Sequence, residues 1–154
     1  MLNEGDRAPQ FSIPGGDGAT LKLSAHKGRA VVVYFYPKDD TPGCTTEAKD
    51  FSSLARQFEA ARTTVIGISP DSVASHQKFV KKHDLAIELA ADEDHAVAEA
   101  FGVWVEKSMY GKKYMGVERS TFLIDKKGTL SRIWRKVKVA GHAEEVLAAA
   151  QALG

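Results

Sequence analysis

The residue best suited to covalent chemistry is Cys44, the only cysteine in a chain of 154 residues. The residues before it, 30–36, are apolar, β-branched or aromatic and predict a buried strand. The apolar residues after it recur at helical spacing: Phe51, Leu54, Ala55 and Phe58. Pro42 and Gly43 mark a turn between these elements, so we expect Cys44 in the first turn of a helix.

This position has a chemical consequence for the thiol. The first turn of a helix directs free N–H groups and the positive end of the helix dipole toward a side chain placed there. A thiolate is stabilised in such a place, and the thiolate is the nucleophilic form of cysteine. The alternative is that Cys44 is a small buried apolar residue, as many free cysteines are. The polar, turn-like residues 41–43 and 45–47 favour a reactive cysteine over a core residue.

A single cysteine also limits the chemistry. It forms no internal disulfide, and dithiol oxidoreductase chemistry, which needs two cysteines, is excluded. The five histidines are scattered along the chain: His26, His76, His83, His95 and His142. No two of them have metal-ligand spacing, so we expect solvated or capping histidines, no metal site and no cofactor.

The elements that position Cys44 alternate along the chain. Two short alternating runs at 11–13 and 21–23 flank a glycine-rich turn, which predicts an N-terminal hairpin. The pattern predicts further strands at 63–68, 87–89, 121–124 and 129–134, and further helices at 72–83, 94–101 and 143–153. Ser72 and Asp94 are the expected N-caps of the first two of these helices.

Apolar residues give the expected inner faces of the predicted helices. For the helix at 72–83 they are Val73, Phe79 and Val80. For the final helix they are Val146, Leu147 and Leu153. The segment 109–115 is expected to be a loop near Cys44.

The order of these elements indicates the fold class. Strand–helix–strand alternation, followed by a hairpin and a last helix, predicts an α/β fold with a central mixed sheet and helices on both faces. In such sheets, sites lie at the carboxyl ends of the strands. Cys44 follows the predicted strand at 30–36 and therefore has the right place.

Composition is that of an ordinary globular chain. Hydrophobic residues are 44% and charged residues 27%, and residues 1–154 are expected to form a single domain. The net charge of +1 gives no general electrostatic footprint for nucleic acid. No apolar run approaches the roughly 20 residues needed to span a bilayer, and the first residues lack the pattern of a signal peptide. A free thiol without a disulfide framework favours a reducing compartment, so we expect a cytoplasmic protein.

The cysteine segment resembles a known motif. The pattern Pro37-x-x-x-Thr41-x-x-Cys44 looks like the active-site motif of the peroxiredoxins, and Thr-Pro-Gly-Cys-Thr at 41–45 is similar to the bacterioferritin comigratory protein (PrxQ) branch. The resemblance extends over nearly the whole chain through residues 5–11, 65–71, 92–95, 101–104 and 119–125. It implies a thioredoxin-like fold in which the N-terminal β-hairpin is the usual peroxiredoxin addition.

The resemblance also implies roles for individual residues. Cys44 would attack the terminal oxygen of hydrogen peroxide or an alkyl hydroperoxide and become a sulfenic acid. Thr41 would contribute its hydroxyl, Arg119 its guanidinium and Cys44 its backbone N–H as donors to the breaking O–O bond. Pro37 would shield the sulfur from water, and Glu47 would anchor Arg119 through a bidentate pair.

Each of these residues has a simpler interpretation as well. Thr41 also fits the helix N-cap, and Pro37 also fits the end of a strand. Arg119 also fits an ordinary surface arginine. An acidic residue such as Glu47 is favoured in any first helical turn.

One position departs from the branch. Many members carry a second, resolving cysteine five residues after the first, where this chain has Lys49. The resemblance therefore implies a one-cysteine variant recycled by an external thiol: a thioredoxin-like protein, glutaredoxin, glutathione or Cys44 of a second copy. We expect a monomer or weak homodimer.

Two functions of different classes remain from the sequence. One is a thiol peroxidase, and the other is a non-catalytic redox sensor or binding protein in which oxidation of Cys44 changes an interface. The intact set of Pro37, Thr41 and Arg119 favours the peroxidase, because a sensor does not require it. A cysteine hydrolase with His83 or His95 as base lacks an orienting motif.

Overall fold

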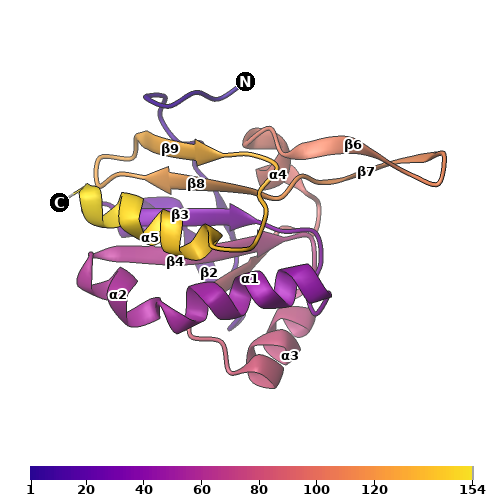
Figure 1. Cartoon of the computed structure of the whole chain (residues 1–154), viewed down its shortest axis with the longest axis horizontal. Coiled ribbons are helices and arrows are strands. Elements are labelled where there is room, and N and C mark those ends of the chain that lie inside the picture. Colours follow the sequence, from indigo (N-terminus) through magenta and orange to yellow (C-terminus); the bar gives the residue numbers. More distant parts are fainter. Residues whose placement is uncertain (154) are drawn as a thin grey trace.

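The structure, a computed structural model, describes residues 1–153. Its centre is a five-stranded sheet in the order β5-β4-β3-β8-β9 (Figure 1). These strands are β3 Ala30–Phe35, β4 Thr63–Ser69, β5 Glu88–Ala91, β8 Ser120–Ile124 and β9 Leu130–Trp134. β3, β4 and β5 run parallel, whereas β8 is antiparallel to β3 and to β9. The sheet is therefore mixed, as predicted.

Helices cover both faces of this sheet. They are α1 Pro42–Ser53, α2 Ala55–Ala60, α3 Val73–His83, α4 Ala96–Ala100 and α5 His142–Ala152, with a 3₁₀ turn η1 at Leu23–His26. α1, α2 and α5 lie together in front of the sheet in Figure 1. Within residues 1–153, no helix combines the length and the apolar character needed to cross a membrane.

The strand β3 shows why the sheet is buried on both faces. Val31, Val33 and Phe35 belong to one apolar cluster, together with residues of α4. The alternate side chains of Val32 and Tyr34 belong to a second cluster, with residues of α1, α3 and α5. A parallel strand covered on both sides is continuously apolar, which is the pattern that the sequence has at 30–36.

One glycine permits the packing of an aromatic ring in the second cluster. A Cβ built on Gly67 of β4 would lie 2.7 Å from the Cζ and Oη atoms of Tyr34 and 2.9 Å from Leu89. Real side chains do not approach that closely, so only glycine at this position leaves room for the Tyr34 ring. The ring also stacks on Phe51 of α1, with centroids 4.7 Å apart.

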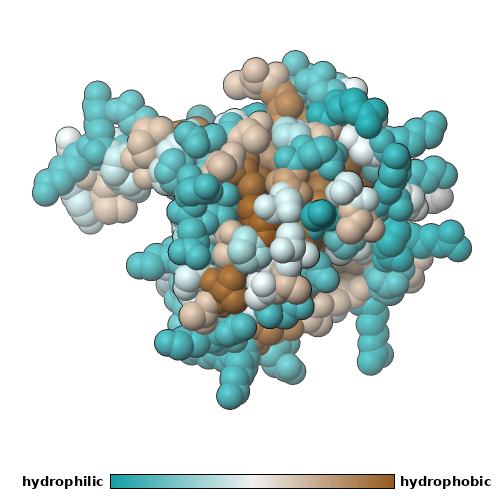
Figure 2. All heavy atoms as spheres, turned by 180° about the vertical axis from the view of Figure 1, so that it is seen from behind, coloured by the Kyte–Doolittle hydropathy of each residue, from teal (hydrophilic) through white to brown (hydrophobic). Residues whose placement is uncertain are grey.

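Two hairpins lie outside the central sheet. β1 (Ser12–Pro14) and β2 (Thr20–Lys22) form the predicted N-terminal hairpin. The loop predicted at 109–115 is wrong, because β6 (Trp104–Met109) and β7 (Lys112–Val117) pair there as an antiparallel arm. The arm projects from the body in Figure 1 and in Figure 2, which shows the opposite face of the molecule. Both faces of its outer part are exposed, so the alternation that marks a half-buried strand is missing.

The helix predictions need three corrections. The helix after Cys44 is interrupted at Leu54, so α1 and α2 are separate. Asp94 does not occupy the N-cap position of α4, which His95 holds in a left-handed conformation, but its carboxylate accepts from the first backbone N–H of the helix, that of Ala96, over 3.2 Å. The Asp92 carboxylate accepts from the next two N–H groups, those of Val97 and Ala98. Leu153, predicted to face inward, is 40% exposed beyond the end of α5. By contrast, Ser72 caps α3 as predicted.

Candidate active site

Cys44 is the third residue of α1, directly after the loop that follows the carboxyl end of β3. The prediction that it lies in the first turn of a helix is confirmed. Its side chain is buried, with 2% of the residue exposed. The first-turn N–H groups have no acceptor within the helix, so they offer positive potential to the sulfur.

Arg119 reaches the sulfur from the neighbouring strand. It immediately precedes β8, whose first residue, Ser120, pairs with Phe35 at the end of β3. Its Nη2 atom donates to the Cys44 Sγ atom over 3.3 Å. A Cβ built on Gly43 would lie 3.3 Å from the same nitrogen, so the absence of a side chain at Gly43 leaves space for the guanidinium.

Glu47 holds the other side of the guanidinium. It lies three residues after Cys44 in α1, and its Oε1 atom accepts from Arg119 Nη1 over 2.5 Å. The predicted pair between these residues is present, but the prediction that it is bidentate is wrong. The second terminal nitrogen of Arg119 is turned to the sulfur, and the Oε2 atom of Glu47 is buried without a partner.

In the pair of Glu47 and Arg119, burial and the charge of the partner shift the pKa of each residue in opposite directions. Burial raises the pKa of Glu47 to about 7, and the nearby Arg119 acts in the opposite direction. Burial alone would lower the pKa of Arg119, but Glu47 and Cys44 outweigh it and raise that pKa above its usual value. The guanidinium is therefore a permanent cation, whereas Glu47 changes its protonation near neutral pH.

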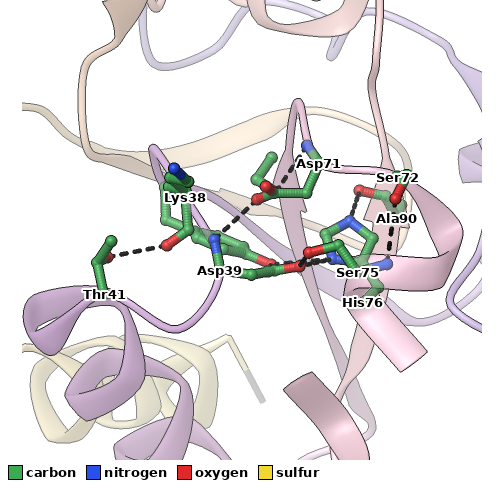
Figure 3. Close-up of polar contacts among 10 residues, drawn as sticks. Lys38, Asp39, Thr41, Asp71, Ser72, Ser75, His76 and Ala90 are labelled. Carbon is green, nitrogen blue, oxygen red and sulfur yellow. Dashed lines mark hydrogen bonds and ion pairs between the residues drawn. The ribbon is translucent and has the colours of Figure 1, made fainter. Parts of the chain in front are cut away.

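Thr41 and Pro37 lie in the loop at 37–41 that joins β3 to α1. Thr41 occupies the N-cap position of α1, but its side chain caps nothing and instead donates to the Lys38 carbonyl over 2.9 Å (Figure 3). Its hydroxyl proton is thus engaged within the loop, which leaves the lone pairs of the oxygen free. Pro37 is partly buried at the start of the same loop.

Two residues near this site were not anticipated from the sequence. The hydroxyl of Tyr34 is buried without a partner, and burial, followed by the charge of Glu47, raises the pKa of Tyr34 well above its usual value. Burial lowers the pKa of Lys107 on β6, with Arg119 adding to that effect and Cys44 opposing it. Tyr34 lies in the strand before Cys44, on the face that packs in the same cluster as Cys44, so the alternation of that strand could have indicated it. Lys107 gave no such signal, because its hairpin was not predicted.

The expectation of solvated or capping histidines is wrong for two of the five. His76 is fully buried, and His142 is buried with its Nε2 atom 2.8 Å from the hydroxyl oxygen of Thr121. Burial lowers the pKa of His142. No cluster of metal-ligating side chains occurs among residues 1–153.

Comparisons with known proteins agree with this geometry. The AhpC/TSA family model matches residues 4–133. The chain is 53% identical over 143 residues to peroxiredoxin Bcp of Bacillus subtilis, covering 93% of this chain and 91% of the relative. It is also 52% identical over 142 residues to peroxiredoxin Bcp of Xanthomonas campestris, covering 92% of this chain and 88% of the relative.

Solved structures give the same result. A PrxQ mutant of Xylella fastidiosa is 41% identical, with a TM-score of 0.94, and the match covers 99% of this chain and 98% of that one. The bacterioferritin comigratory protein of X. campestris, studied for alkyl peroxide reduction in trapped intermediate and ligand complexes, is 48% identical. Its TM-score is 0.89, with 93% of this chain and 91% of that one covered. The thioredoxin-like peroxiredoxin fold is therefore shown. With its single cysteine, the chain belongs to the AhpC/TSA family as a one-cysteine peroxiredoxin of the Bcp (PrxQ) branch.

Proposed function

We propose that Cys44 is the residue that reduces hydrogen peroxide and alkyl hydroperoxides. The Cys44 thiolate attacks the terminal peroxide oxygen, so that an S–O bond forms as the O–O bond breaks. The sulfur is oxidised to a sulfenic acid, and the peroxide is reduced to an alkoxide or hydroxide that leaves as alcohol or water after taking up a proton. The single observation that carries this proposal is the Arg119 guanidinium, 3.3 Å from the sulfur and held by Glu47 on its other side.

Ionisation of the thiol alone does not account for fast catalysis. A free thiol is about 3% ionised at pH 7, so complete ionisation gains only about thirtyfold, or ~2 kcal/mol. The remainder must come from groups that bind the separating oxygens better than the intact peroxide. Among residues 1–153, Arg119 is the only cationic side chain with a hydrogen bond to the Cys44 sulfur. Its ion pair with Glu47 holds the guanidinium in place before the peroxide arrives.

The loop supplies the rest of the peroxide site in this proposal. The backbone N–H of Cys44 lies in the first turn of α1, where N–H groups lack an acceptor within the helix, and it serves as a second donor to the peroxide. Because the Thr41 proton is held by the Lys38 carbonyl, its oxygen accepts a hydrogen bond from the hydroperoxide O–H rather than donating one. Pro37 excludes water from the sulfur.

Recycling requires a second molecule. Cys44 is the only cysteine in the sequence, so the chain provides no internal thiol. Position 49, on the same continuous helix as the buried Cys44, is an exposed lysine. We propose that an external thiol attacks the sulfenic acid, releasing water and forming a mixed disulfide. A second thiol then releases reduced Cys44. Glutathione, glutaredoxin and thioredoxin-like proteins have the required chemistry.

The direct test is peroxide consumption in the presence of a small dithiol, comparing the wild type with Cys44→Ser. We expect steady consumption by the wild type and only the uncatalysed background in the variant. Mass spectrometry after one equivalent of peroxide, with a sulfenic-acid trap, should place the adduct on Cys44. Unmodified sulfur under these conditions would show that the proposal is wrong.

A second test concerns recycling. Lys49→Cys should form an intramolecular disulfide after peroxide treatment, detected as a mass loss of about two daltons. Residues five apart do not share a helical face, so this bond requires the start of α1 to unwind. If the disulfide is absent while a mixed disulfide with added glutathione still forms, α1 does not open on this timescale and external resolution is the accessible route.

A further inference from the structure

A second buried polar cluster lies behind the loop at 37–41. It consists of Tyr36, Asp39, Asp71, Ser75 and His76 and is called here the Asp39 cluster. The Asp39 carboxylate accepts from the Tyr36 hydroxyl over 2.6 Å and from the Ser75 hydroxyl over 2.7 Å. His76 Nδ1 lies 2.8 Å from Asp39 Oδ2. The side chains of Asp39, Asp71, Ser75 and His76 converge in Figure 3, where α3 meets the loop.

The acceptors around His76 determine how many protons the ring carries. Its Nε2 atom lies 3.0 Å from the Ala90 carbonyl oxygen, which only accepts, so Nε2 carries a proton. The short contact between Nδ1 and Oδ2 needs another proton. The same oxygen, Asp39 Oδ2, already accepts from the Ser75 hydroxyl, and Oδ1 accepts from Tyr36, so the carboxylate acts as the acceptor in this contact too. The second proton is therefore on Nδ1, and His76 is an imidazolium.

This ion pair connects α3 to the loop that supplies the peroxide site. Asp39 is 8% exposed and His76 is fully buried, so solvent does not compete for the contact. The backbone N–H of Asp39 also donates to Asp71 Oδ2 over 2.8 Å. Asp39 is therefore fixed through its backbone and its side chain, one residue after Lys38, whose carbonyl holds the Thr41 hydroxyl.

We propose that His76, as an imidazolium, is a positioning residue for peroxide reduction: through Asp39 it holds the loop at 37–41 in the geometry that binds the peroxide. This inference rests on the proposed function of Cys44. His76 touches neither the sulfur nor the substrate and acts only through the loop. The charged or titratable groups that face it are Asp39 from the loop and Tyr36 from the end of β3, and Asp71 lies behind Asp39.

The chain offers a matched control for this contact. Lys82, also on α3, contacts the same loop through Asp40, with its Nζ atom 2.7 Å from Asp40 Oδ2. Both side chains are solvent-exposed, at 62% and 43%. Exposed pairs of this kind contribute about 0–1 kcal/mol, so Lys82→Gln should leave the loop in place.

The experiment measures the second-order rate of Cys44 oxidation by hydrogen peroxide in the wild type, His76→Ala, Asp39→Ala, Asp39→Asn and Lys82→Gln. His76→Ala and Asp39→Ala should react about tenfold to hundredfold more slowly, because small displacements of positioning groups have effects of this size. Asp39→Asn should react more slowly than the wild type but faster than the alanine variants. An amide can donate to a neutral His76 and accept from Tyr36, so it preserves the contact without the charge.

Alkylation of Cys44 by iodoacetamide separates positioning from general damage. It needs the thiolate but not the peroxide site, so it should change by less than about threefold in every variant. Equal peroxide rates in the wild type and both alanine variants, with only their thermal stability lowered, would show a purely structural role and overturn the proposal. A wild type that does not react with peroxide would instead refute the proposed function of Cys44.

The wild type alone tests the charge state. The ¹⁵N chemical shifts of the His76 ring at about pH 7 should show both nitrogens protonated. An unprotonated Nδ1 would overturn the imidazolium assignment, whatever the folding behaviour of the variants.

Discussion

The two polar clusters beside the loop at 37–41 differ in how completely their hydrogen bonds are satisfied. In the Cys44 cluster (Cys44, Glu47 and Arg119), one carboxylate oxygen of Glu47 has no partner, and the nearby Tyr34 hydroxyl has none either. In the Asp39 cluster, every buried side-chain oxygen and nitrogen is paired. A saturated network stabilises one geometry, whereas the Cys44 cluster keeps a buried acceptor and a buried hydroxyl without partners.

The largest effect should come from removing the cation of the Cys44 cluster. Arg119→Ala should lower the second-order rate with hydrogen peroxide by roughly 10²–10³, the size expected for a donor to a developing negative charge. Stopped-flow measurement of Cys44 oxidation checks this prediction, with Arg132→Ala on the exposed side of β9 as control. A rate for Arg119→Ala within about threefold of the wild type would mean that the contact with sulfur has no catalytic role.

Thr41→Val should have a smaller effect, a loss of roughly tenfold in the same rate. Valine removes the oxygen proposed to accept from the peroxide and the bond to the Lys38 carbonyl, but it leaves the two proposed donors, Arg119 and the Cys44 N–H, in place. Thr41→Ser, which keeps the hydroxyl, should recover most of the rate. If serine reacts as slowly as valine, the methyl group of Thr41 and not its hydroxyl is what matters.

Glu47→Gln should change the pH dependence of the reaction more than its maximum. With a pKa of about 7, Glu47 becomes neutral in acid and then holds Arg119 less firmly. The wild-type rate should therefore fall as the pH drops through about 7, and the variant should lack this fall. At about pH 8 the variant should be about threefold to tenfold slower. Parallel pH profiles would show that Glu47 does not titrate in this range.

The Glu47 carboxyl group should also make the free energy of unfolding depend on pH, with a trend opposite to that of the reaction rate. Its pKa is about 7 in the folded protein and close to 4.5 when exposed, so the folded state binds more protons between these values. The free energy of unfolding should consequently fall as the pH rises from about 4.5 to about 7. Urea denaturation over this range should show a shallower decline in Glu47→Gln than in the wild type. An equal decline in both would assign it to other groups.

The smallest effects, on the free energy of unfolding, should come from removing the hydroxyl of Tyr34 in β3 or of Tyr36 directly after β3. Tyr36→Phe removes a hydrogen bond to Asp39 and should cost about 1–2 kcal/mol of unfolding free energy. Tyr34→Phe removes a buried hydroxyl that has no partner, so it should be neutral or stabilise by up to about 1 kcal/mol. Chemical denaturation of both variants checks the contrast. Equal losses would show that the Tyr34 hydroxyl is paired after all.

Much of the fold followed from patterns with a clear physical cause. The continuous apolar run of β3, the Ser72 cap and the turn before Cys44 each depend on neighbours in sequence, and each was predicted correctly. The pairing of Arg119 with Cys44 and Glu47 was expected only through family resemblance. These residues meet because β8 lies beside β3, which no local pattern specifies.

The missed features depend on tertiary contacts. His76 lies at helical spacing between Val73 and Phe79, on the inner face of α3, but its buried state is possible only because Asp39 and the Ala90 carbonyl face it. The monodentate geometry of Glu47 likewise depends on the sulfur competing for the guanidinium. The arm of β6 and β7 packs little against the body, so it leaves no burial pattern in the sequence.

The close approach of Tyr34 to Gly67 has a consequence for how this sequence can evolve. A side chain at position 67 cannot coexist with a six-membered ring at position 34, since its Cβ would lie 2.7 Å from the ring carbon. A mutation of Gly67 therefore becomes acceptable only after Tyr34 has been replaced by something smaller and the Leu89 side chain, which would lie 2.9 Å from the same Cβ, has moved aside. Replacing Tyr34 first removes the stacking partner of Phe51 in α1, the helix whose first turn holds Cys44. The order of the two substitutions therefore matters, and a side chain at position 67 can be reached only by disturbing the packing beneath that helix.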